Sequence, residues 1–78
     1  MITLKEACKI GEKECGGPIV KIIETKTCWV FMDEKRVNRG QVNICPMVKK
    51  ETGKVFFSAL DIPADDTMWQ EIPVPTDY

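Results

Sequence analysis

The stretch that decides the fold is PMVKKETGKVFF, residues 46–57, in which apolar, extended runs flank a short polar turn. Glycine tolerates the positive φ of tight hairpins, and Gly53 stands where such a turn would need it. We therefore predict a hairpin that joins strands at 41–49 and 54–59. Because proline cannot donate to a β-ladder, Pro46 predicts an edge position or a bulge in the first of them.

Two further strands are predicted before this hairpin, at 19–26 and 27–33. The first is rich in β-branched residues. In the second, Trp29 and Phe31 alternate with other apolar residues, so both faces are apolar and the strand should be central. The polar segment DEKRVNRG, residues 33–40, has the Asn and Gly signals of a loop.

The N-terminal residues predict a helix at 3–16. Thr3 followed three residues later by Glu6 is a capping-box pattern, and the Gly-Gly-Pro sequence at 16–18 is a helix stop. Apolar and small residues recur three and four positions apart, which gives one narrow stripe. A stripe of small side chains would let the helix approach a sheet closely.

The C-terminal residues 61–78 hold three of the five prolines, and proline at this density favours an ordered but irregular tail. The whole chain, 1–78, is therefore predicted to be one α+β domain. In this fold one N-terminal helix packs on a four-stranded antiparallel meander.

The net charge of −1 conceals an uneven distribution. Residues 1–54 carry a net charge of +4 and residues 55–78 a net charge of −5, so the tail either folds back on the basic part or is offered to a basic partner. No apolar run approaches the length of a membrane span, and no secretory signal precedes the predicted helix. We expect a cytoplasmic protein that does not bind membranes.

Residue chemistry gives little support to catalysis or cofactor binding. Gly53-Lys54 lacks the other glycine and the Ser or Thr of a phosphate-binding loop. The chain has no histidine, and its four cysteines include no Cys-x-x-Cys pair, so we expect buried thiols and no metal. An acid–base role for Asp65-Asp66 would have to come from a proline-rich tail. We predict neither an enzyme nor a cofactor.

The two basic clusters would lie at opposite ends of a meander and could not form one stripe that binds a nucleic acid. We therefore expect a protein partner rather than a nucleic acid. The aromatic residues have two interpretations, a core under the helix or an exposed anchor for the partner. An edge strand would also allow a homodimer. The candidate contact residues are Trp29, Phe31, Lys35, Arg36, Arg39 and Trp69.

The order of helix, meander and tail, together with TCWVFMD and CPMVKKETGKVF, resembles the small bacterial domains grouped with immunity protein 35 of polymorphic toxin systems. That resemblance implies a non-enzymatic protein that neutralises a toxin. The opening residues ITLKEA and the Thr-Gly-Lys-Val hairpin are also similar to PepSY domains, which implies a regulatory or inhibitory module, usually exported.

Overall fold

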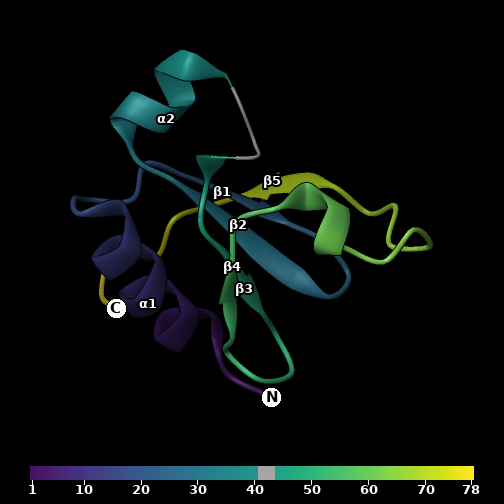
Figure 1. Cartoon of the computed structure of the whole chain (residues 1–78). Helices are drawn as coiled ribbons and strands as arrows, with labels where there is room; N and C mark the ends of the chain where they lie inside the picture. Colours follow the sequence, from purple (N-terminus) through teal and green to yellow (C-terminus); the bar gives the residue numbers. More distant parts are fainter. Residues whose placement is uncertain (41–43) are drawn as a thin grey trace.

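The computed structural model describes residues 1–40 and 44–78. Helix α1 (Leu4–Cys15) packs on an antiparallel sheet of five strands in the order β4-β3-β2-β1-β5 (Figure 1). The predicted α+β class and meander are confirmed, with one strand more than the four predicted. The strands are β1 (Lys21–Glu24), β2 (Cys28–Met32), β3 (Met47–Lys49), β4 (Val55–Phe56) and β5 (Gln70–Ile72).

Helix α1 begins and ends where its sequence signals predict. The Glu6 N–H donates to the Thr3 hydroxyl and the Thr3 N–H donates to the Glu6 carboxylate, both at 3.2 Å. Gly16 ends the helix with a φ of 76°. Within the helix, a Cβ at Gly11 would lie only 2.5 Å from the Phe31 ring, so the absence of a side chain there lets α1 approach the sheet.

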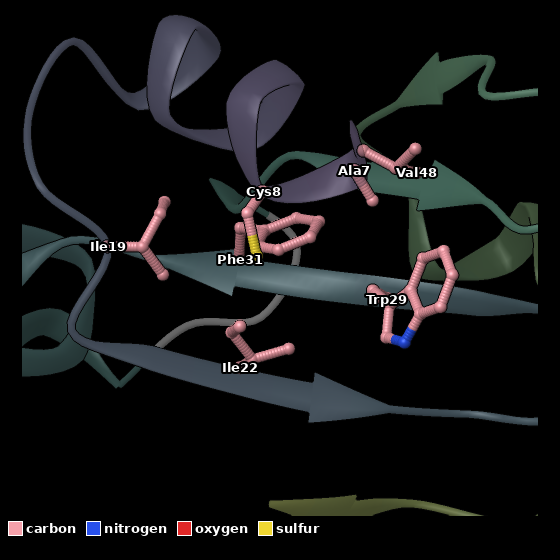
Figure 2. Close-up of a cluster of buried hydrophobic side chains, with 7 residues drawn as sticks. All are labelled: Ala7, Cys8, Ile19, Ile22, Trp29, Phe31 and Val48. Carbon is pink, nitrogen blue, oxygen red and sulfur yellow. The ribbon is translucent and has the colours of Figure 1, made fainter. Parts of the chain in front are cut away.

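The core has two layers, one on each face of β2, whose five residues are all buried. Figure 2 shows the layer under α1, where the helix contributes Ala7 and Cys8. Both faces of β2 are therefore covered, which confirms the predicted central strand. The α1-side layer consists of Ala7, Cys8, Ile19, Ile22, Trp29, Phe31 and Val48, and the opposite layer of Val30, Met32, Cys45 and Met47.

The segment between β2 and β3 differs from the prediction. Residues expected to form a loop contain a short helix, α2 (Glu34–Arg39), capped by Asp33 and by Gly40 at a φ of 66°. The strand predicted at 41–49 is shorter, because its ladder begins only at Met47, and positions 41–43 lie outside the described residues.

The edge position predicted for Pro46 is wrong, because β3 lies between β2 and β4. Pro46 stands just before β3, where the ladder needs no N–H from it. Its carbonyl accepts a hydrogen bond from the Phe31 N–H at 3.0 Å.

The tail is only partly irregular, because Gln70–Ile72 forms β5 and pairs with β1. We call residues 57–69 the crossover, since they lead from β4 at one edge of the sheet to β5 at the other (Figure 1). The crossover includes a short 3-10 helix, Ala59–Asp61. Ala59 and Ile62 pack on the core layer opposite α1, so this segment covers the second face of the sheet.

Candidate protein-binding surface

The two strand aromatics proposed as partner contacts lie in the core. Trp29 is 6% exposed and Phe31 is fully buried, both under α1 (Figure 2). A partner could reach either ring only by displacing the side chains that cover it. The core interpretation of these residues is therefore confirmed, and their proposed role as contacts is wrong.

The indole ring of Trp29 has two polar partners, Glu24 and Lys50. Its indole N–H donates to the Glu24 carboxylate at 3.1 Å, and the Lys50 ammonium lies 3.0 Å from the same group. Lys50 also lies 5.2 Å from the centre of the indole ring, a cation–π arrangement. The hydrogen bond from Lys50, followed by that from Trp29, lowers the pKa of Glu24 against the opposing effect of burial. The polar groups of Trp29, Glu24 and Lys50 are thus paired with one another.

Helix α2 carries the three basic residues predicted to contact a partner, and these residues differ in their contacts and exposure. Arg36 points inward: its Nε donates to the Ile44 carbonyl at 3.0 Å and its Nη1 to the Asp33 carboxylate at 3.1 Å and, at 3.5 Å, to the Cys15 carbonyl. It therefore ties α2 to the end of α1 and to the approach to β3. Lys35 and Arg39 remain exposed.

Four of the seven exposed large apolar residues in the described part of the chain lie in the crossover, and Trp69, the last candidate, is among them. Its side chain is 42% exposed, so it does not close the core as the alternative interpretation required. Leu60 on the 3-10 helix is 93% exposed. Phe57, with 45% of its surface accessible, and Met68, with 40%, complete the set. A single segment therefore presents four large apolar side chains to solvent.

The residue that fixes this segment is Asp66, which sequence reasoning considered only as part of an acid–base pair. It is 5% exposed and accepts hydrogen bonds from Thr25, Lys26 and Thr27 in the turn between β1 and β2. With three donors on Oδ2 and one on Oδ1, this carboxylate is a structural anchor. No local sequence signal marks it, because its partners lie about forty residues away along the chain.

The cysteines behave as core residues. Cys8, Cys28 and Cys45 are buried and Cys15 is half-buried. Burial raises the pKa of the Cys8 thiol to about 11, so it is protonated and a poor nucleophile at neutral pH. Among residues 1–40 and 44–78, no group of three His, Cys, Asp or Glu side chains is arranged to hold a metal ion.

A concave feature lies at the end of the sheet away from α2. Its lining includes Lys26 and Thr27 from the β1–β2 turn, Lys49 from β3, and Phe56 from β4. Because β2 and β3 are antiparallel, this end of the sheet is opposite to α2, so the two basic clusters are separated as the sequence predicted (Figure 1).

Comparison with protein-family models, curated proteins and solved structures gives no match. In the part of the chain that the structure describes, no helix has the length and apolar character required to cross a bilayer.

Proposed function

We propose that this chain is a non-enzymatic protein-binding domain, of the kind that neutralises a toxin by covering it. The observation that carries the proposal is the exposure of four large apolar side chains on one segment, the crossover. Exposed apolar side chains that form a contiguous patch on a soluble domain typically mark a contact surface. Leu60 is the centre of the proposal, because 93% of its surface is accessible.

The size of the effect supports contact as the role of these residues. Burying one such side chain in an interface contributes about 1.5–3 kcal/mol, and an aromatic anchor such as Trp69 is typical of binding hot spots. The β4 and β5 ladders hold the two ends of the segment, and Asp66 fixes it to the β1–β2 turn. A surface that is already ordered loses less conformational entropy on binding than a flexible loop would.

The buried polar groups of the described residues support the same role. None of the buried side-chain nitrogen or oxygen atoms lacks a hydrogen-bond partner. Asp66, which a catalytic hypothesis would need as an acid or base, accepts hydrogen bonds at both carboxylate oxygens. Contact through the exposed segment therefore has more support than chemistry in the interior.

The test combines affinity capture with a protection assay. Immobilised wild-type protein, Leu60→Ser and Trp69→Ala are exposed to extract of the native host, and captured proteins are identified by mass spectrometry. The gene of a captured protein is then expressed with and without this chain, and growth is measured. We expect one protein that wild type retains, that Leu60→Ser loses, and whose toxicity the chain suppresses.

The matched control is Val20→Ser, since Val20 is 52% exposed but lies before β1, outside the crossover. It should capture the same protein as wild type. Equal capture by wild type and by both crossover variants would overturn the proposed surface. A captured protein that affects growth equally with and without this chain would overturn the toxin-neutralising role.

A PepSY-like regulatory or inhibitory module is the second candidate. The two segments that carry that resemblance lie together, because a Cβ at Gly53 would lie 3.3 Å from the Ile2 side chain. The Ile2 N–H also donates to the Lys50 carbonyl at 2.9 Å. Secretion of the native gene product, measured by fractionating the host, would favour this candidate over a toxin antagonist that acts inside the cell.

A further inference from the structure

The concave feature opposite α2, which we call the lysine groove, has a volume of about 270 Å³. One side is the β1–β2 turn with Lys26 and Thr27, and the other is the crossover with Asp61 and Pro63. The half-buried Phe56 side chain also lines the groove. The groove therefore joins an aromatic surface to several charged side chains, and it begins one residue beyond the exposed Leu60.

The lysines of the groove differ in whether their charge is compensated. Lys50 is paired with Glu24 at 3.0 Å and lies over Trp29 on the α1 side of the sheet. The Lys26 ammonium has no acidic partner among the described residues, and the Lys49 ammonium lies 5.8 Å from the centre of the Phe56 ring with no carboxylate in contact. Two uncompensated positive charges thus flank an apolar surface.

The sides of the groove are fixed by hydrogen bonds. The Lys50 N–H donates to the Thr27 carbonyl at 2.9 Å, which joins β3 to the β1–β2 turn. The N–H of Thr27 donates to the Asp66 carboxylate at 3.0 Å, which joins that turn to the crossover. A groove whose sides are already positioned can bind a ligand without first ordering its own backbone.

We propose that the lysine groove binds an extended acidic segment of the partner protein, with carboxylates facing Lys26 and Lys49 and an apolar side chain against Phe56. The inference deepens the protein-binding function and rests on it. Charge complementarity and the aromatic surface carry the assignment, since a peptide can supply both kinds of group in alternation along an extended strand.

The same charges disfavour a nucleic acid in this groove. Asp61 and Glu51 also line it, and neither has an ion-pair partner among the described residues. A phosphate backbone carries charge at every nucleotide and would meet these carboxylates wherever it lay. A peptide can place its carboxylates opposite the lysines and uncharged residues opposite Asp61 and Glu51.

The test uses the whole chain labelled with ¹⁵N and a short peptide of alternating glutamate and leucine. Amide resonances of Thr27 and Phe56 report on the groove. The comparison ligands are the same peptide with glutamine for glutamate, an oligothymidylate and inorganic phosphate. We expect the acidic peptide to shift the groove resonances, to bind less tightly as salt is raised, and to bind more tightly than the others.

Charge variants give effects of opposite sign. The double variant Lys26→Gln/Lys49→Gln should weaken binding of the acidic peptide about fivefold, and Asp61→Asn should tighten it about twofold. The control is Lys9→Gln/Lys13→Gln, on the exposed face of α1 and outside the groove, which should bind like wild type. All four substituted lysines are exposed, so folding is not at risk.

Three results would overturn the inference: no shift of the groove resonances at millimolar acidic peptide, equal binding of the glutamine peptide, or tighter binding of the oligothymidylate or of phosphate. These outcomes are separable from failure of the proposed function. Capture of a protective partner that depends on Leu60 but not on Lys26 and Lys49 removes only the groove. Groove binding of the acidic peptide without any captured partner removes the function on which it rests.

Discussion

Replacing Asp66 tests whether one buried carboxylate holds the crossover against the β1–β2 turn. The Asp66 carboxylate accepts hydrogen bonds from the Thr25 hydroxyl at 2.8 Å, from the Lys26 N–H at 2.8 Å, and from the N–H and hydroxyl of Thr27. Burial alone would raise the pKa of Asp66, but these hydrogen bonds, with the Thr27 hydroxyl foremost, outweigh it and lower the pKa to about 2.

The magnitude follows from this shift. A carboxyl group whose pKa falls from 3.8 to about 2 on folding contributes about 2 kcal/mol to the free energy of unfolding near neutral pH. We expect Asp66→Asn to lose about that amount. We expect Asp66→Ala to lose about 3 kcal/mol, because the donors of the turn are then left without an acceptor.

The sign of the pH dependence is fixed by the direction of the shift. Because the pKa of Asp66 is lower in the folded state, its stabilisation is complete above about pH 4 and is lost as the pH falls towards about 2. Urea unfolding followed by tryptophan fluorescence, at about pH 7 and about pH 2.5, measures this loss. Wild type should lose more stability than Asp66→Asn between these conditions.

The control is Asp65→Asn, since Asp65 is the exposed neighbour of Asp66 and should change the free energy of unfolding by less than about 0.5 kcal/mol. If Asp66→Asn is as stable as this control near neutral pH, or keeps the pH dependence of wild type, then Asp66 is not the anchor of the crossover.

Three further substitutions or measurements test the packing. Gly11→Ala should lower the free energy of unfolding by about 1–3 kcal/mol in urea, because its Cβ would overlap the Phe31 ring; unchanged stability would mean that α1 is free to move away. Arg36→Lys should lower it by about 1–2 kcal/mol in thermal unfolding, because an ammonium cannot reproduce the forked contacts to Ile44 and Asp33. Cys8 should resist maleimide labelling in the native protein and react after denaturation, as measured by mass spectrometry, and rapid native labelling would contradict its burial.

The sequence predicted the elements whose signals are local. The helix stop at Gly16 and the apolar alternation of β2 each depend on neighbouring residues, and both are confirmed. Helix α2 had a local signal, since Asp33 and Gly40 are good caps, but the six residues between them, five of them polar, are equally typical of a loop. Strand β5 had no local signal, because its three residues form a strand only by pairing with the edge of β1 that β2 leaves open.

The candidate contact residues likewise differ in how far the sequence could predict their roles. Trp29 and Phe31 suited both a core and a contact surface, and only the position of α1 decides between them. Arg36 was predicted to be an accessible charge, but it is used to join α2 to Ile44. The anchoring role of Asp66 depends on residues far away in sequence, so it could be recognised only after the sheet had brought the turn and the crossover together.

The charge asymmetry of the chain explains why a lysine groove persists in an acidic protein. The tail folds back as the sequence allowed, with Asp77 at 3.0 Å from Lys5 and Glu71 at 4.0 Å from Lys21. These exposed pairs contribute little stability, so the β5 ladder, the buried carboxylate of the crossover and the packing of Val74 and Tyr78 on the core hold the tail in place. Their geometry, rather than charge attraction, therefore decides which lysines the tail neutralises. Lys26 is not among them, so a chain with a net charge of −1 still presents unpaired lysine ammonium groups in this groove.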